Sequence, residues 1–261
     1  MKLSIYQADA FTEQIFGGNP AAVVPLQQWL PDTLMQNIAA ENNLSETAFM
    51  VPDKNDFELR WFTPAVEVDL CGHATLAAAH ILFSELNYSQ PEIQFKTKSG
   101  ILTVRKDAEW LAMNFPADFT EKIEISSLFS ESLGAKPVEV CKGRLDFLAT
   151  FSSQSEIMAL DPDFTLMKKL GKRGVIATAK GSDVDFVSRY FAPNAGVNED
   201  PVTGSAHCVL VPYWSNLMKK NEFIARQDSQ RGGFLKCKLI GERVEMSGKA
   251  ATYLRGEIAV G

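Results

Sequence analysis

The sequence has few residues of the kinds that hold metal ions or disulfide bridges. Its 261 residues include four cysteines and three histidines. No two cysteines form a C-x-x-C pair, and no cysteine–histidine spacing matches a zinc site. The cysteines are Cys71, Cys141, Cys208 and Cys237, and the histidines are His73, His80 and His207. We therefore expect reduced, mostly buried thiols and no metal site.

The sequence also lacks a surplus of basic residues and a long apolar run. Its 26 lysines and arginines against 32 aspartates and glutamates leave a net charge of −6. Nucleic acids and anionic membranes attract clustered basic residues, so neither is an expected partner. No apolar run approaches the roughly 20 residues that span a bilayer. Asp9 comes too early for the core of a signal peptide, and these absences together predict a soluble, cytoplasmic protein.

What the sequence does contain is an internal repeat. Three matches occur in the same order in both halves of the chain, at nearly constant spacing. The matching pairs are R-W-F-T-P (60–64) with R-Y-F-A-P (189–193), G-H-A (72–74) with G-S-A (204–206), and residues 99–117 with residues 232–250. Such a duplication predicts two similar halves. Two halves that face each other make a cleft, and clefts between domains are favoured ligand sites.

The hydrophobic pattern predicts similar strands and helices in the two halves. In the first half, strands are expected at 2–10, 20–25, 46–51, 57–62, 101–105 and 109–114, and helices at 31–43 and 73–86. In the second half, strands are expected at 174–179 and 185–191, a hairpin at 234–246, and helices at 163–170 and 205–219. We predict an N-terminal domain of residues 1–116, completed by a C-terminal strand at about 251–261, and a C-terminal domain of residues 117–250.

Two glycine-led helix starts stand at equivalent points of the repeat, at Gly72-His73 and at Gly204-Ser205. A helix start leaves backbone N–H groups unpaired at the positive end of the helix dipole. A glycine at that point allows a ligand to approach the backbone closely. Two such starts that face each other would bind an anion, most naturally a carboxylate. The alternative is that both glycines are simply tight turns into buried helices.

Two acidic residues near these starts are candidates for proton transfer. Glu46 opens the apolar strand pattern E-T-A-F-M-V, and alignment through the two arginine motifs places it opposite the aliphatic Val175. A carboxyl group flanked by apolar surface has a raised pKa and exchanges protons near neutral pH. Asp200, in E-D-P-V-T-G-S-A, is the second candidate. The alternatives are that Glu46 is an exposed product of drift and that Asp200 only forms a turn.

At these residues the chain resembles the PhzF family, the phenazine-biosynthesis-like proteins of the diaminopimelate-epimerase-type fold. The shared motifs are F-G-G-N-P-A-A-V-V (16–24), L-S-E-T-A-F (44–49), R-W-F-T-P (60–64), D-L-C-G-H-A-T (69–75) and E-D-P-V-T-G-S-A (199–206). The resemblance implies an α+β fold of two domains related by a pseudo-twofold axis. Each domain would be a curved, mostly antiparallel sheet wrapped around a central helix.

The resemblance also implies an isomerase that moves a proton on a small carboxylic acid without a metal or organic cofactor. The active site would lie in the cleft between the domains, with Glu46 as the acid/base and with His73 and Asp200 as further catalytic residues. Ser205 would line the same pocket, and a homodimer is plausible. The substrate-binding amides would be those of Gly72, His73, Gly204 and Ser205.

Cys71 leaves a second chemistry open. Racemases and epimerases of the same fold use two opposed cysteines as bases, and here Cys71 takes the first position while Thr203 takes the second. Threonine offers no base at neutral pH, so a two-cysteine racemase is not expected. A Cys71-assisted epimerase or dehydratase remains an alternative, as does a simple packed thiol. A non-catalytic protein that binds a small acid is another alternative, and a hydrolase built from Ser205 with His207 or His73 is a weaker one.

Overall fold

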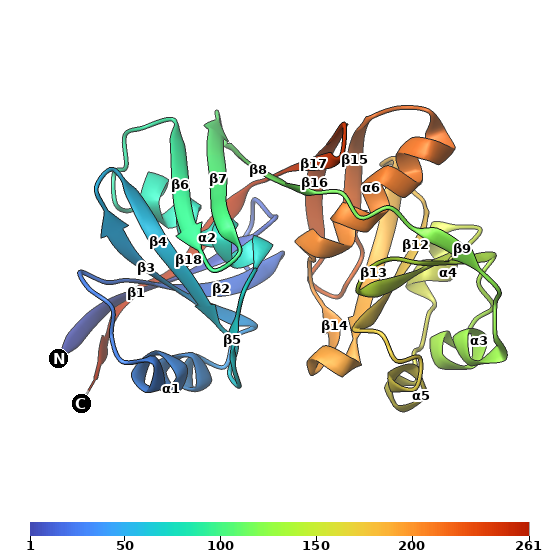
Figure 1. The fold of residues 1–261 in the computed structure, drawn as a ribbon, viewed down its shortest axis with the longest axis horizontal. Coiled ribbons are helices and arrows are strands. Elements are labelled where there is room, and N and C mark those ends of the chain that lie inside the picture. The colour runs from blue at the N-terminus through green and yellow to red at the C-terminus, as the bar shows by residue number, and fades with distance from the viewer. Residues whose placement is uncertain (261) are drawn as a thin grey trace. The chain divides into compact units, whose positions relative to one another are not determined.

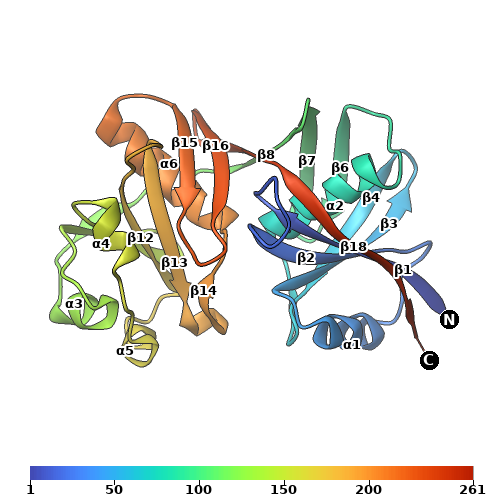
Figure 2. The ribbon, with the colours of Figure 1, turned by 180° about the vertical axis from the view of Figure 1, so that it is seen from behind.

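The structure is a computed structural model that describes residues 1–260, and these residues fall into two compact units. The first unit contains Met1–Asn114 and the described residues from Ser247 on, and the second contains Phe115–Met246. Figure 1 labels their helices and strands, and Figure 2 shows the same elements from behind. Among the helices of the described residues, none has the length and apolar character needed to cross a membrane.

The first unit is one mixed sheet with two helices. Its strands are β1 (Lys2–Ala10), β2 (Asn19–Pro25), β3 (Glu46–Asp53), β4 (Asp56–Phe62), β5 (Glu67–Val68), β6 (Glu92–Thr97), β7 (Gly100–Asp107), β8 (Trp110–Pro116) and β18 (Ala250–Ala259). Its helices are α1 (Asp32–Asn42) and α2 (Gly72–Ser84). β2 pairs in parallel with β3, as β4 does with β6, and the remaining pairs are antiparallel. The last strand of the chain therefore pairs with the first, β18 with β1.

Helix α2 is the central helix of the first unit. Its sequence, GHATLAAAHILFS, is apolar on nearly every side, and such a helix is stable only when it is buried. It packs against β1, β2 and β3, while α1 packs against β3 and β4. A core of Met35 and Ile38 from α1 with Val24 and Phe49 from the sheet fills the space under α1. Because α2 is surrounded by packed side chains, its first residues are held in place.

The second unit is also a mixed sheet, with more short helices. Its strands are β9 (Glu121–Ile123), β10 (Glu139–Lys142), β11 (Asp146–Thr150), β12 (Gly174–Lys180), β13 (Phe186–Ala192), β14 (Val197–Asp200), β15 (Glu222–Gln227), β16 (Gly233–Ile240) and β17 (Arg243–Gly248). Its helices are α3 (Ser127–Leu133), α4 (Gln154–Met158), α5 (Phe164–Lys168), the 3₁₀ turn η1 (Pro193–Ala195) and α6 (Gly204–Met218). β11 pairs in parallel with β12, and β13 with β15.

Strand pairing shows that the two units repeat one another. In the first unit β2 is parallel to β3, β3 is antiparallel to β4, β4 carries the short β5, and β4 is parallel to β6. In the second unit β11, β12, β13, β14 and β15 pair in the same order and directions. Helix α2 follows β5 as α6 follows β14. The duplication predicted from the sequence is confirmed, and the fold is a duplicated mixed α/β fold.

An arginine–glutamate pair recurs at the same place in both units. In the first, Arg60 on β4 donates to Glu67 on β5 through Nε and Nη2, at 2.7 and 2.9 Å. In the second, Arg189 on β13 donates to Glu199 on β14 at the same two distances. Each glutamate precedes by five residues the glycine that begins α2 or α6. Bidentate arginine–carboxylate pairs fix geometry, so each pair fixes the short strand that leads into a helix start.

Most of the predicted elements are present, and the ends differ by a few residues. Both predicted glycine-led helices, the paired strands before them and the final strand are found. The helix expected at 163–170 is the shorter α5. The sequence analysis missed the strands β5, β6, β14 and β15 and the 3₁₀ turn η1, and it missed every element between residues 121 and 158. The two helices of this stretch, α3 and α4, have seven and five residues, too few for a periodic pattern to stand out.

Candidate functional site

A polar cluster in the first unit gathers at the start of α2. Glu46 is the first residue of β3, whereas Cys71, Gly72 and His73 form the entry into α2. Cys71 is the extended N-cap residue, and its side chain makes no capping hydrogen bond. The first N–H groups of α2 are therefore left without a side-chain cap, which suits them to an anionic ligand.

Glu46 and His73 form the closest contact in this cluster. Oε2 of Glu46 lies 3.0 Å from Nε2 of His73, and the two side chains are 18% and 7% exposed. Burial opposes charge on both groups. For Glu46, His73 and Cys71 outweigh that effect, and the pKa of the carboxyl is lowered. For His73, neighbouring Cys71 and Glu46 outweigh it, and the pKa of the ring is raised well above its ordinary value. Both shifts favour a carboxylate beside a protonated ring, and the pKa of Glu46 is lowered rather than raised as we expected.

Cys71 lies on the other side of the same ring. Its Sγ is 3.5 Å from Nδ1 of His73, and Nδ2 of Asn19 is 3.3 Å from that nitrogen. Burial, followed by the charge of Glu46, raises the pKa of the Cys71 thiol to about 11. A thiol with this pKa is protonated at neutral pH, so it is a poor base. The geometry brings Glu46, Cys71 and His73 into one group that could also hold a metal ion.

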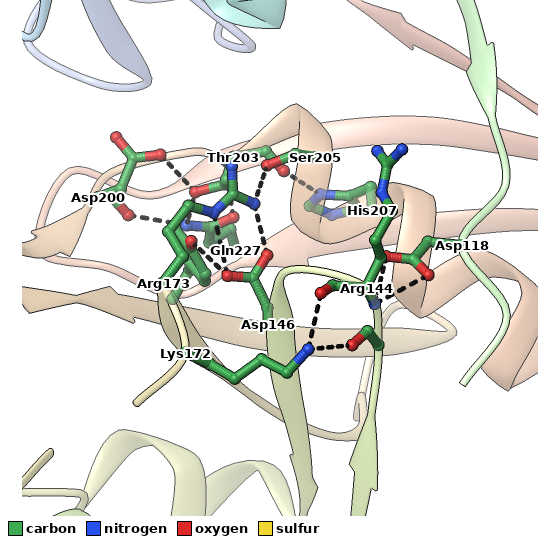
Figure 3. A network of polar contacts seen from close by, with 12 residues as sticks. Asp118, Arg144, Asp146, Lys172, Arg173, Asp200, Thr203, Ser205, His207 and Gln227 are labelled. Carbon is green, nitrogen blue, oxygen red and sulfur yellow. Dashed lines mark hydrogen bonds and ion pairs between the residues drawn. The ribbon is translucent and has the colours of Figure 1, made fainter. Parts of the chain in front are cut away.

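A second polar cluster surrounds the start of α6 in the second unit, shown in Figure 3. Thr203 is the extended N-cap of α6, and its hydroxyl donates to the carboxylate of Asp200 rather than capping the helix. Gln227 accepts from the N–H of Thr203 at 2.9 Å and donates to the carbonyl of Asp200 at 2.8 Å. Asp200 and Thr203 are therefore held beside Gly204 and Ser205.

Arg173 is a member of this cluster that the sequence analysis missed. It donates to Oγ of Ser205 at 3.0 Å and makes two hydrogen bonds to Asp146, whose side chain is 2% exposed (Figure 3). The hydroxyl of Tyr190 donates to the same carboxylate at 2.9 Å. Ser205 is thus oriented by a guanidinium that a buried aspartate fixes in place.

The strand register corrects the alignment of Glu46. Arg60 pairs with Phe49 in the first unit, and Arg189 pairs with Ala177 in the second. Glu46 lies three residues before Phe49 in β3, and Gly174 lies three residues before Ala177 in β12. Glu46 therefore corresponds to Gly174, and the predicted partner Val175 is one residue out of register. Both residues begin their strands. Aligning the predicted strand starts, rather than the arginine motifs alone, would also have brought Arg173 to notice.

His207 does not support a hydrolase. Its Nδ1–H donates to the carbonyl of Thr203 at 2.9 Å, so in the neutral ring Nε2 carries no proton. Burial lowers the pKa of the ring to about 4. Ser205 Oγ receives its hydrogen bond from Arg173, and no hydrogen bond joins Ser205 to a histidine among residues 1–260. A serine nucleophile activated by His207 therefore has no basis in this geometry.

The candidate residues are accordingly arranged as two groups, one in each unit. Glu46, Gly72 and His73 meet at the start of α2, and Asp200 lies with Gly204 and Ser205 at the start of α6. The first group contains a carboxylate and an imidazole ring of raised pKa, while the second contains hydroxyl groups, the Asp200 carboxylate and a guanidinium. That the two helix starts face each other stays a prediction.

Comparison with known proteins gives a consistent result. Residues 8–256 match the PhzC-PhzF family, described as phenazine biosynthesis-like protein. The chain is 51% identical, over 99% of both chains, to a Pseudomonas aeruginosa protein named as an uncharacterized isomerase. It resembles the crystal structure of a PhzF family protein from Enterococcus faecalis at a TM-score of 0.98 and 45% identity, covering 100% of both chains. A hydroxyproline epimerase from Agrobacterium vitis shares the fold alone, at a TM-score of 0.65 and 10% identity over 99% of this chain and 93% of that one.

Proposed function

The chain belongs to the phenazine biosynthesis-like PhzC-PhzF family and is an isomerase, and on this premise we propose that it moves a proton on a small carboxylic acid with Glu46 as the acid/base. The observation that carries the proposal is the contact of 3.0 Å between the Glu46 carboxylate and His73. It holds an ionised carboxylate at a helix start that has no side-chain cap. The reaction as proposed uses protein groups only.

The proposed reaction begins with substrate binding at the start of α2. The backbone amides of Gly72 and His73 receive the substrate carboxylate at the positive end of the helix. Glu46 then removes a proton from a carbon next to this carboxylate or next to a conjugated system. The amides stabilise the negative charge that develops, because they are already oriented toward it. Glu46 returns the proton to another carbon, and the net change is an isomerisation.

His73 has a distinct role in this proposal. As an imidazolium in contact with Glu46, it keeps the carboxylate ionised before the reaction, which a buried carboxyl group alone would not be. It can also donate a proton to the substrate once Glu46 has taken one. His73 is therefore proposed as a catalytic residue together with Glu46.

The second unit contributes a binding group of its own. We assign the binding of an anionic or hydroxyl-bearing group to the amides of Gly204 and Ser205 and to the Ser205 hydroxyl. Arg173 supports this role because it donates to Ser205 Oγ. Asp200, which accepts from the Thr203 hydroxyl at the same helix start, is proposed as a further group for proton transfer.

The proposal is tested by hydrogen exchange in deuterium oxide. The protein is incubated with a pool of small carboxylic acids, and deuterium entering carbon positions is measured by mass spectrometry and NMR. We expect label with the wild type and with Glu41→Gln, an exposed glutamate of α1. Glu46→Gln should lower the rate of labelling by about 10²- to 10⁴-fold, the usual contribution of a general base.

Other outcomes would redirect the assignment. Equal labelling by the wild type and Glu46→Gln would remove Glu46 as the base and move the chemistry to Cys71 or His73. Loss of labelling after alkylation of Cys71, with Glu46→Gln still active, would identify the Cys71-assisted epimerase or dehydratase. Binding of an acid by the wild type with no labelling from a complete pool would favour a non-catalytic binding protein.

A further inference from the structure

The side chains of Glu46, Cys71 and His73 offer three different kinds of metal ligand within one small volume. The carboxylate oxygen, the thiol sulfur and an imidazole nitrogen all lie within 4.8 Å of one another. All three residues belong to the first unit. This group is not apparent from the sequence, because Glu46 stands 25 residues before Cys71 and no short cysteine–histidine motif is present.

The sulfur and the nitrogen already have the spacing of a tetrahedral site. Sγ of Cys71 lies 3.5 Å from Nδ1 of His73. A tetrahedral Zn²⁺ with Zn–S of about 2.3 Å and Zn–N of about 2.0 Å places its ligand atoms roughly 3.5 Å apart. A cation between these two atoms would leave α2 in place, since Cys71 is its N-cap and His73 its second residue. The Asn19 amide, whose Nδ2 lies 3.3 Å from Nδ1, would have to turn aside.

Glu46 would be the third ligand. Its Oε2 now faces Nε2 of His73, on the far edge of the ring, so it must shift by roughly an ångström or more to reach a cation at Nδ1. The side chain is 18% exposed and has rotatable bonds, so such a shift needs no change in β3. Water would complete the tetrahedron, as it does at zinc sites with three protein ligands.

The hydrogen bonding of the group also leaves room for a ligand. Oε2 of Glu46 and Nε2 of His73 are buried, and their contact is not aligned as a hydrogen bond. Within residues 1–260 neither atom has another hydrogen-bond partner. Buried polar atoms are rarely left in this way, and each calls for an explanation such as a catalytic role, a water or an ion.

We propose that Glu46, Cys71 and His73 bind a thiophilic divalent cation, Zn²⁺ in preference to Mg²⁺ or Ca²⁺, and that the bound cation inhibits the enzyme. A thiolate selects Zn²⁺ and Co²⁺ over the harder cations, which prefer oxygen. Binding replaces the thiol proton of Cys71 and one ring proton of His73, and both protons leave to solvent. Inhibition rests on the proposed function, since it follows from the occupation of Glu46, whereas binding itself does not.

The experiment is a titration of the metal-free protein with Co²⁺, followed by absorption spectroscopy. A thiolate bound to Co²⁺ produces a charge-transfer band in the near ultraviolet. We expect one equivalent of Co²⁺ to produce the band, Zn²⁺ to abolish it by displacement, and Mg²⁺ in excess to leave it unchanged. Cys71→Ser should lose the band. Cys141→Ser should keep it, because Cys141 lies 3.5 Å from Glu139 but has no histidine beside it.

Glu46→Gln and His73→Gln provide two further variants in case Cys71→Ser does not fold, which circular dichroism would reveal. Each should weaken Co²⁺ binding by at least about 100-fold, because even the outer partners of metal ligands contribute roughly 10- to 100-fold. A wild type without the band, or a band that survives in Cys71→Ser or in both glutamine variants, would overturn the proposal. Hydrogen exchange measured with a chelator present tests the proposed function independently, so either idea can fail alone.

Discussion

Glu46 and Gly174 begin equivalent strands of the two units, yet only Glu46 carries a side chain. A Cβ atom on Gly174 would lie 2.4 Å from the carbonyl oxygen of Phe191 and 3.0 Å from the hydroxyl of Tyr190. The space that an acid would need in the second unit is thus filled by the tyrosine that donates to Asp146. The two units thus repeat this strand start, and packing around Gly174 leaves an acid at only one of the two positions.

The contact at Gly174 predicts a stability effect. Gly174→Ala should lower the free energy of unfolding by about 1–3 kcal/mol, because the added methyl group meets backbone that cannot move freely. Gly256→Ala is the matched control in β18, where an added Cβ meets only side-chain atoms at 3.7 and 3.9 Å. Urea unfolding measures both variants. Equal midpoints would show that β13 moves away from the methyl group.

Shortening the Glu46 side chain tests whether its position matters as well as its charge. Glu46→Asp keeps a carboxylate but draws it back by about one bond, so the contact with His73 is lost. We expect the rate of hydrogen exchange to fall about 100-fold, the usual effect of a 1 Å displacement, with substrate affinity nearly unchanged. A rate close to that of the wild type would mean that Glu46 acts at long range, through its charge alone.

The pair of Arg60 and Glu67 predicts a loss of stability on a conservative change. The two side chains are 19% and 17% exposed, and the guanidinium also lies 5.2 Å from the ring of Phe62. Arg60→Lys cannot form the bidentate contact, so we expect the free energy of unfolding to fall by about 1–3 kcal/mol. Arg189→Lys should behave alike. Lys2→Ala, which breaks an exposed pair with Glu257, should cause no measurable change.

Asp146 and Arg173 predict a coupling that a double-mutant cycle can measure. Arg173→Gln leaves the carboxylate of Asp146 buried without its cation, and we expect a loss of about 3–5 kcal/mol in the free energy of unfolding. Asp146→Asn in the same chain should restore a large part of this loss. Additive effects of the two substitutions would show that the pair is not a unit.

His207 predicts a pH dependence with a defined sign. Burial lowers the pKa of its ring to about 4, below the ordinary value of 6.5, so the folded state binds fewer protons than the unfolded state between these values. The contribution of His207 to stability is complete above pH 6.5 and is lost as the pH falls through 6.5 toward 4. Histidine NMR should show a neutral ring protonated at Nδ1 above pH 5, and a midpoint near 6.5 would contradict the assignment.

Much of this protein could be predicted from its sequence, because the informative features are local. The hydrophobic pattern located the strands before α2 and α6, and the repeated motifs around Arg60 and Arg189 indicated the duplication. The glycines at both helix starts were identified by their neighbours in the chain. Helix starts and strand alternation depend on residues a few positions apart, so they are visible in the sequence.

The tertiary structure decided which side chains meet, because strand register and helix packing are not written in local spacing. The Glu46–His73 contact joins residues 27 positions apart, through β3 and α2 packed on one another. Strand register matched Glu46 with Gly174 instead of Val175, and packing brought Arg173 to Ser205. The sequence determined by itself that two helix starts exist. Packing determined that one received a carboxylate with an imidazolium and the other a guanidinium.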